Sequence, residues 1–200
     1  PTRRSSDLTP LVTTETFTAL VDCHEKSGAA ATVLTAHMPD PTGYGRVIRD
    51  DKGQVVKIVE QKDGTPEELL VDEVNAGIYC FDMPLLWDMQ HNVTNDNAQG
   101  EYYLTDIIGM LVSSGHIVSA FAAPSYDETL GVNSRQQMAE AEQILRRRKL
   151  QQLMADGVSI IDPNNTYVDT TVTIGRDTVL YPGTILEGHT VIGEDCHIGP

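Results

Sequence analysis

Basic residues are scarce in this chain. Its 200 residues include 14 lysines and arginines against 29 acidic residues, which gives a formal net charge of −15. An acidic surface repels both the phosphate backbone of nucleic acids and anionic lipid headgroups. The composition therefore predicts no nucleic-acid partner and no membrane partner. A small phosphorylated ligand is still compatible with it, because such a ligand needs only local cations or a metal ion.

Cysteines and long apolar runs are also scarce. Cys23, Cys80 and Cys196 are scattered and form no CxxC pair, which predicts small buried side chains in a reducing compartment. No apolar run reaches the roughly 18 residues that a membrane span needs, and no signal peptide is visible. We therefore expect a cytoplasmic protein.

The first eight residues match nothing that follows them. They have no apolar period, they contain two arginines, and they resemble the translation of a sequencing-adapter oligonucleotide. We interpret residues 1–8 as non-native. A genuine flexible basic N-terminus is the alternative.

The rest of the chain has enough apolar residues for a core, 40% of the total. Helical spacing predicts helices over residues 13–28, 84–89, 101–113 and 134–156. Short apolar runs predict strands over residues 29–36, 45–49, 54–59, 74–81 and 117–122. The sequence Asp50-Asp51-Lys52-Gly53 predicts a hairpin turn between the second and third of these strands. Alternating helices and strands predict an α/β layered domain.

Beyond Asp162-Pro163 the aliphatic residues recur every six positions. The first series is Val168, Ile174, Leu180, Leu186, Ile192 and Ile198, and a second series is Val179, Ile185 and Val191. A period of six fits neither a helix nor a simple alternating strand, and it predicts a parallel β-helix with three short sides per coil. We expect one aliphatic residue per side to stack into an inner core. An ordinary β-rich domain is the alternative.

Three residues in short motifs suit the binding of a polar ligand. Gly45 has no Cβ, so its backbone can approach a ligand closely. Glu60 leaves a predicted strand at its end, where ligands gather in open α/β sheets. The amide of Asn75 can both donate and accept hydrogen bonds. Each has a structural alternative: a turn glycine, an acid paired with Lys62, and an asparagine that satisfies backbone groups.

The long predicted helix raises two further questions. Asn133 directly precedes it, which is the position of a helix N-cap. Within the helix, Arg146-Arg147-Arg148-Lys149 is a run of positive charge, which predicts a solvated face or contact with an acidic neighbouring subunit. Tyr102, Tyr103 and Asp106 precede or begin another helix, and we expect them to pack it rather than to line a ligand cleft.

Five segments together resemble one bacterial enzyme family. It is the bifunctional family that is both N-acetylglucosamine-1-phosphate uridyltransferase and glucosamine-1-phosphate acetyltransferase, in its low-GC Gram-positive form. The segments are Pro-Thr-Gly-Tyr-Gly-Arg at 41–46, Val-Glu-Gln-Lys-Asp at 59–63, Asn-Ala-Gly-Ile at 75–78, Asn-Ala-Gln-Gly-Glu-Tyr-Tyr-Leu-Thr-Asp-Ile at 97–107 and Gly-Val-Asn-Ser-Arg at 131–135. The resemblance runs from Thr9 to Pro200.

The resemblance implies a fold in three parts. Residues 9–133 would be the C-terminal part of a Rossmann-like nucleotidyltransferase domain, and residues 134–157 a linking helix. Residues 158–200 would be the first coils of a left-handed parallel β-helix of hexapeptide repeats. The full-length parent would be a homotrimer.

The resemblance also implies an activity. UTP and N-acetylglucosamine-1-phosphate would react with Mg²⁺ to give UDP-N-acetylglucosamine and pyrophosphate, for peptidoglycan synthesis. The full-length parent would also acetylate glucosamine-1-phosphate with acetyl-CoA. Gly45, Glu60, Asn75 and Asn133 would bind UDP-N-acetylglucosamine, and the side-chain oxygen of Asn133 would also be a magnesium ligand.

The chain departs from the family in ways that affect activity. The glycine-rich nucleotide loop is absent, and Leu8 stands where the family has a magnesium-binding aspartate. His189 and His197 lie in the first coils and do not match the acetyl-transfer histidine. We assign no catalytic residue and expect the chain itself to be inactive. The alternatives are another sugar-1-phosphate nucleotidyltransferase, or a non-catalytic module for sugar-phosphate binding or trimerisation.

Overall fold

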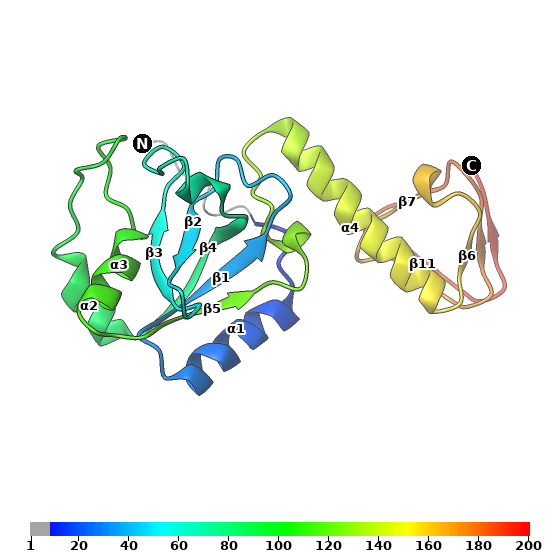
Figure 1. The fold of residues 1–200 in the computed structure, drawn as a ribbon. Helices are drawn as coiled ribbons and strands as arrows, with labels where there is room; N and C mark the ends of the chain where they lie inside the picture. Colours follow the sequence, from blue (N-terminus) through cyan, green and yellow to red (C-terminus); the bar gives the residue numbers. More distant parts are fainter. Residues whose placement is uncertain (1–8) are drawn as a thin grey trace. The chain divides into compact units, whose positions relative to one another are not determined.

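The computed structural model describes residues 9–200 (Figure 1). The chain divides into two units, one that ends at Gly131 and one that begins at Val132. The interpretation of residues 1–8 as non-native, including the substitution at Leu8, lies outside the described residues.

The first unit is built on a five-stranded sheet in the order β3-β2-β4-β1-β5. The strands are β1 (Ala31–His37), β2 (Arg46–Arg49), β3 (Val55–Val59), β4 (Glu73–Phe81) and β5 (Val118–Ala122). The pair β1–β5 is parallel, whereas β1–β4, β2–β3 and β2–β4 are antiparallel. The predicted α/β class is confirmed, but the sheet is mixed, so the Rossmann-like description fits only its parallel pair.

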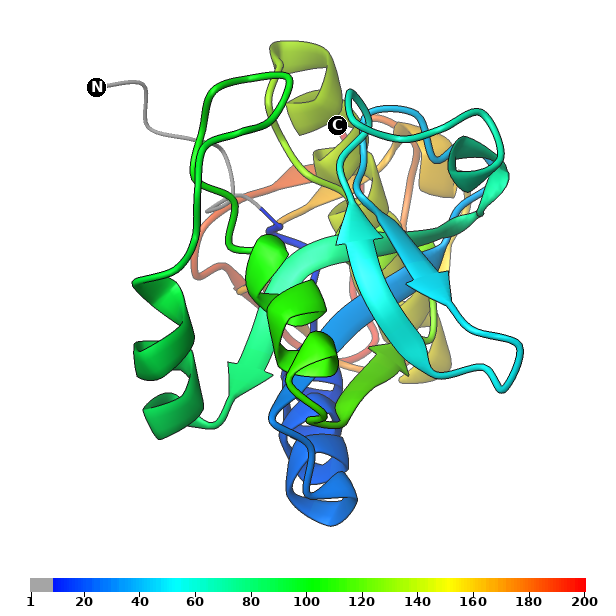
Figure 2. The same cartoon turned by 60° about the vertical axis from the view of Figure 1, so that its left-hand side comes forward.

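Helices cover both faces of this sheet. Leu34 of β1 packs with Leu20 of α1 (Thr14–Ser27), while the preceding Val33 packs with α3 (Asp106–Ser113). Successive strand residues point to opposite faces, so β1 is apolar on both sides. The helix α2 (Met83–Gln90) joins α3 on its face, as Figure 1 shows, and Figure 2 shows the β2–β3 hairpin beside α3.

The helix α1 begins and ends as the sequence predicts. Thr13 caps it by accepting from the Thr16 backbone N–H, and Gly28 ends it with φ of 60°. Its apolar residues are not all buried, however. Phe17 is 46% and Val21 45% exposed, while Leu20 is 1% exposed.

The helix predicted over residues 101–113 begins later, at Asp106. The side-chain oxygen of Asn97 accepts from the backbone N–H groups of Gln99 and Glu101, each at 3.2 Å, and Gly100 has φ of 64°. This asparagine turn competes with the helix for the same backbone donors. The apolar period therefore predicted the helix correctly but extended it through a turn.

The second unit combines the helix α4 (Arg135–Ala155) with seven two-residue strands. The strands are β6 (Ser159–Ile160), β7 (Tyr167–Val168), β8 (Thr173–Ile174), β9 (Val179–Leu180), β10 (Ile185–Leu186), β11 (Val191–Ile192) and β12 (His197–Ile198). They form three short parallel sheets, and most partners lie eighteen positions apart, as Ile185 does from Tyr167. After three six-residue steps, a strand therefore pairs with the strand eighteen positions earlier in the chain.

The core of this unit contains five of the six residues of the first six-residue series. Val168 and Leu180 are buried with Leu150 and Leu153 of α4, and Ile174, Leu186 and Ile198 pack against them. Two of the three residues of the second series face outward, since Ile185 is 64% and Val191 76% exposed, while Val179 is half-buried. The first track therefore forms the inner core, and the second lies mostly at the surface.

The basic run on α4 is only partly a solvated face. The Arg146 side chain is 15% exposed, and its guanidinium carbon lies 4.2 Å from the centre of the Tyr167 ring. Lys149 Nζ donates to the Val172 carbonyl at 2.6 Å. The prediction of a solvated face is wrong for these two residues, because their long side chains pack over the first coil.

Within residues 9–200, no helix has both the length and the apolar character that a membrane crossing would require.

Candidate functional site

Three of the four predicted ligand-binding residues meet at one end of the first sheet. Gly45 precedes β2 and Glu60 follows β3, and the antiparallel pair Arg46–Val59 places these two ends side by side. The backbone N–H of Asn75 donates to the Gly45 carbonyl at 2.9 Å. Sheet register therefore brings together residues from three separate motifs.

Gly45 leaves room beside the Glu60 carboxylate. A Cβ at this position would lie 3.1 Å from Ile58 Cγ2 and 3.4 Å from Glu60 Oε1. Because Gly45 is buried, a side chain here would occupy space next to the carboxylate. The alternative of a glycine needed only for its turn applies better to Gly43, whose φ is 89°.

Thr105 fixes the carboxylate of Glu60. Its hydroxyl donates to Glu60 Oε1 at 3.1 Å, and Thr105 is 5% exposed. Thr105 is also the N-cap of α3, yet its side chain makes no capping hydrogen bond. A threonine at that position usually accepts from a helix N–H, so the hydroxyl is directed to Glu60 instead of the helix end.

Asn75 is oriented by its own strand. Its Oδ1 accepts from the Gly77 N–H at 2.9 Å, within a bulge of β4 where Gly77 has φ of 75°. Burial raises the pKa of the Tyr79 hydroxyl, a hydrogen bond with Asn75 opposes that rise, and the Glu60 charge adds to it. Asn75, Tyr79 and Glu60 are thus close enough to interact. The alternative predicted from the sequence, an asparagine that satisfies backbone groups, is also correct, because Asn75 Oδ1 accepts from a backbone N–H.

The turn that carries Glu60 contacts two other segments. Gln61 Oε1 accepts from the Gly43 N–H at 3.0 Å, and Asp63 Oδ1 accepts from the Ala98 N–H at 2.8 Å. Lys62 Nζ donates to Gln99 Oε1 at 3.0 Å. The turn 60–63 therefore joins the glycine turn on one side to the 97–105 segment on the other. Lys62, which the sequence offered as a partner of Glu60, contributes to this second connection.

Of the two tyrosines of the 97–107 motif that were expected to pack the helix, Tyr103 is buried and Tyr102 is not, so the prediction is wrong for Tyr102. Tyr103 is 8% exposed and its hydroxyl accepts from Gln99 Nε2 at 2.7 Å, whereas Tyr102 is 69% exposed. Burial, and then the charge of Asp63, raises the pKa of Asp106. Asp106 and Thr105 also line a groove of about 730 Å³ between β3 and α3, which Gly45, Glu60 and Asn75 do not line.

Asn133 lies in the second unit and is exposed. The N-cap of α4 is Ser134, which accepts from the Gln137 N–H at 3.1 Å, so the N-cap alternative for Asn133 is wrong by one residue. The Asn133 N–H donates to Gln137 Oε1 at 2.7 Å. Its assignment to the ligand site stays a prediction.

The predicted magnesium role of Asn133 depends on the metal-ligating side chains of residues 9–200. No group of three or more histidine, cysteine, aspartate or glutamate side chains is arranged there to hold a metal ion. Asn133 supplies one neutral oxygen, whereas Mg²⁺ usually takes carboxylates, waters and phosphates together. These residues by themselves do not fit a magnesium site.

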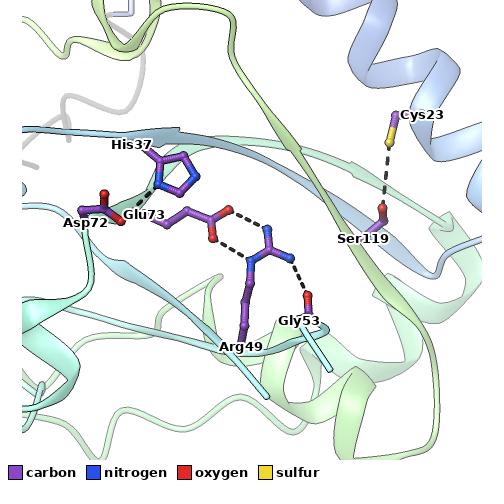
Figure 3. Close-up of polar contacts among 7 residues, drawn as sticks. All are labelled: Cys23, His37, Arg49, Gly53, Asp72, Glu73 and Ser119. Carbon is purple, nitrogen blue, oxygen red and sulfur yellow. Dashed lines mark hydrogen bonds and ion pairs between the residues drawn. The ribbon is translucent and has the colours of Figure 1, made fainter. Parts of the chain in front are cut away.

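A second polar cluster in the first unit is structural (Figure 3). Arg49 Nε and Nη2 donate to the two oxygens of Glu73, both at 2.6 Å, and Nη1 donates to the Gly53 carbonyl. Burial favours a higher pKa for Glu73, but the hydrogen bonds from Arg49 and the positive charge of its guanidinium favour the carboxylate, and the pKa is lowered. The pair ties β2 to β4 and stabilises the sheet.

Sequence reasoning missed three residues near the site. Thr105 and Tyr79 belong to motifs or strands that were recognised, but only the tertiary structure shows that Thr105 donates to Glu60 and that the Glu60 charge raises the pKa of Tyr79. Arg46 is 2% exposed, and a lone arginine in a strand gives no signal of burial. Tyr79 lies two residues from Gly77 and four from Asn75, so strand alternation was the available signal for it.

Comparisons with known proteins identify the family of this chain. A family described as nucleotidyl transferase matches residues 10–149. The Bifunctional protein GlmU of Geobacillus thermodenitrificans (strain NG80-2) is 57% identical over 192 residues, which cover 96% of this chain and 42% of that relative. The protein of the same name from Limosilactobacillus reuteri (strain DSM 20016) is 52% identical over 191 residues, with 96% and 42% covered.

This chain thus spans about 42% of the length of these curated relatives. The matches confirm the resemblance that the five motifs predicted. The family match covers most of the first unit, including Gly45, Glu60 and Asn75, and continues into α4. The chain belongs to the nucleotidyl transferase family.

Proposed function

We propose that this chain is part of a uridyltransferase that joins UTP to N-acetylglucosamine-1-phosphate. The products are UDP-N-acetylglucosamine and pyrophosphate, and the first unit supplies part of the sugar site. The convergence of Gly45, Glu60 and Asn75 at one end of the sheet is the observation that carries the proposal. A cytoplasmic location is consistent with these substrates, and it stays a prediction.

The residues of the site suit the recognition of sugar hydroxyls. The Glu60 carboxylate accepts hydrogen bonds, while the Asn75 amide and the Tyr79 hydroxyl offer both donors and acceptors. Gly45 keeps the space beside Glu60 open. Phosphoryl transfer depends mainly on positioning and charge neutralisation, so a rigid sugar site contributes by holding the sugar phosphate in line with the nucleotide.

Magnesium belongs to the proposal only at the level of the parent protein. When bound, Mg²⁺ would neutralise phosphate charge. Asn133 is the residue of this chain that the resemblance assigns to it, and the acidic partner is missing because this chain has Leu8 at the position of the family's magnesium-binding aspartate.

The second unit fits the start of a left-handed parallel β-helix. Its strand partners eighteen positions apart and its single buried aliphatic track support this proposal. In the full-length parent, we propose a homotrimer that also acetylates glucosamine-1-phosphate with acetyl-CoA.

The sugar site is tested by titrating the chain with N-acetylglucosamine-1-phosphate and following ¹H–¹⁵N NMR shifts. We expect the wild-type chain to bind and Gly45→Ala to bind about tenfold more weakly, because the added methyl crowds Glu60. Gly109→Ala is the matched control. A Cβ there meets only Lys57 Cβ, at 3.7 Å. Equal binding by Gly45→Ala and wild type would reject the site.

The reaction is tested by pyrophosphate release from UTP, Mg²⁺ and N-acetylglucosamine-1-phosphate. We expect no turnover by this 200-residue chain and turnover by a version with an upstream nucleotide loop added. Turnover with glucose-1-phosphate instead would favour the alternative of another sugar nucleotidyltransferase. Sugar-phosphate binding without turnover in either protein would favour the non-catalytic module.

A further inference from the structure

Arg46, next to Gly45, is an unusual residue to find fully buried. It is 2% exposed, and its side chain carries a guanidinium cation. Burying a charge is costly unless hydrogen bonds compensate for it. Nη2 donates to Gln61 Oε1 at 2.8 Å and Nη1 donates to the Tyr44 carbonyl. Within residues 9–200, Nε has no hydrogen-bond partner.

Gln61 connects this buried cation to the glycine turn. Its Oε1 accepts from Arg46 and also from the Gly43 N–H at 3.0 Å. The backbone on both sides of Tyr44 is therefore held, at Gly43 by Gln61 and at the Tyr44 carbonyl by Arg46. Gly43 has φ of 89°, a conformation that favours glycine. One side-chain oxygen thus holds the turn closed against the end of β3.

The same contact determines where Glu60 lies relative to Gly45. Gln61 directly follows Glu60, and Thr105 holds the Glu60 carboxylate from the other side. A change in the Gln61 contact would move the glycine turn relative to the carboxylate. Only a few tenths of an ångström separate open space from a close contact here, since the Cβ position of Gly45 is 3.4 Å from Glu60 Oε1.

We propose that Gln61, together with Arg46, is a positioning residue that holds Gly45 and Glu60 at the separation that sugar binding requires. The inference rests on the proposed function. Neither residue needs to touch the sugar. Gln61 acts through the Gly43 N–H and through the buried guanidinium, both of which need an acceptor oxygen at this position.

Three substitutions test the role. Gln61→Met keeps the length of the side chain and removes the acceptor oxygen. Gln61→Glu keeps the oxygen and adds a charge opposite to that of Arg46. Gln54→Met is the matched control, because Gln54 is exposed at the far end of the same β2–β3 hairpin.

We would measure two quantities by ¹H–¹⁵N NMR for each chain. They are the hydrogen-exchange rate of the Gly43 amide and the Kd for N-acetylglucosamine-1-phosphate, at a temperature where thermal unfolding shows every variant to be folded. We expect the exchange rate and the Kd each to rise about tenfold in Gln61→Met. This is the order of effect expected when hydrogen bonds to a charged partner are lost. Gln61→Glu restores both to near the wild-type values, and Gln54→Met leaves both unchanged.

The outcomes separate this inference from the proposed function. Wild-type binding with equal binding by Gln61→Met overturns the inference and leaves the proposed function standing. No binding by the wild-type chain overturns the proposed function. In that case, unchanged Gly43 exchange in Gln61→Met also overturns the inference, and faster exchange supports Gln61 as the residue that holds the turn.

Discussion

The two units of this protein are organised in different ways. In the second unit the same interaction repeats, with aliphatic residues six positions apart stacked in one core and strands paired eighteen positions apart. In the first unit the candidate site depends on single contacts between irregular segments, such as Thr105 to Glu60 and Gly43 to Gln61. A repeat distributes stability over equivalent positions, whereas the site depends on a few polar contacts that have no duplicate.

The two units can also be observed separately. The chain has one tryptophan, Trp87, which lies in α2 of the first unit. Its fluorescence reports unfolding of that unit, while far-UV circular dichroism reports both units. Substitutions in the repeats are expected to change unfolding followed by circular dichroism and to leave unfolding followed by Trp87 fluorescence unchanged.

The largest effect is expected from the inner track of the second unit. Leu180→Ala should lower the free energy of unfolding of that unit by about 4 kcal/mol, because Leu180 is fully buried and its removal leaves a cavity. Urea unfolding followed by circular dichroism measures this. The control Ile185→Ala, on the outward track and 64% exposed, should change it by less than about 0.5 kcal/mol. Equal effects would show that the two tracks are not inner and outer.

A glycine of the repeats is expected to have the next largest effect. Gly175→Ala would place a Cβ 2.6 Å from the backbone N of Glu194 and 2.6 Å from the carbonyl carbon of Gly193. We expect a loss of about 3 kcal/mol, at the upper end for overpacking, measured by the same unfolding experiment. The control is Gly193→Ala, whose nearest contact is Cys196 Sγ at 4.0 Å. A Gly175→Ala chain as stable as Gly193→Ala would contradict this close packing of successive coils.

In the first unit, the ion pair of Arg49 and Glu73 gives a test that depends on pH. Glu73→Gln should cost about 2 kcal/mol, less than for a fully buried pair because the Arg49 side chain is 35% exposed. Trp87 fluorescence during urea unfolding reports the loss.

The pKa of Glu73 is lower in the folded than in the unfolded chain. The stabilisation from this carboxylate is therefore present above its unfolded pKa and is lost as the pH falls through its folded pKa. The difference between wild type and Glu73→Gln should shrink over that acidic range. A difference that stays constant there would rule out the ion pair as its cause.

The smallest effect concerns a turn between strands of the repeats. Asp177 has φ of 62°, a left-handed conformation that β-branched residues strongly disfavour. Asp177→Val should destabilise the second unit by about 1 kcal/mol, while Asp177→Asn should leave it unchanged because asparagine tolerates this conformation. Thermal unfolding by circular dichroism compares the two. If valine is tolerated as well as asparagine, backbone conformation does not limit this turn.

Sequence reasoning succeeded where the pattern is local or repeated. The hairpin at Asp50–Gly53 forms as predicted, with the Asp50 side chain accepting from the N–H groups of Lys52 and Gln54. The six-residue series predicted which residues, such as Leu180, form the second core. It did not distinguish the exposed second series, because period alone does not state which side of a short strand faces inward.

Sequence reasoning failed where a polar side chain chooses between partners. Thr105 looked like part of a helix, and its hydroxyl instead holds Glu60. Asn133 looked like an N-cap, but Ser134 takes that role. Competing hydrogen bonds of similar strength decide such cases, and the outcome depends on the neighbours that the fold provides.

The amino-acid sequence by itself determined the family, through the resemblance of its five motifs, together with the α/β class of the first unit and the register of the repeats, and it predicted three residues of the candidate site. The class and the register follow from sequence because apolar periodicity and turn chemistry act over a few residues. Only the tertiary structure decided that Gly45, Glu60 and Asn75 meet, that Thr105 and Tyr79 join them, and that a buried Arg46 holds the turn through Gln61. These contacts link residues far apart in the chain, and their geometry follows from sheet register and burial.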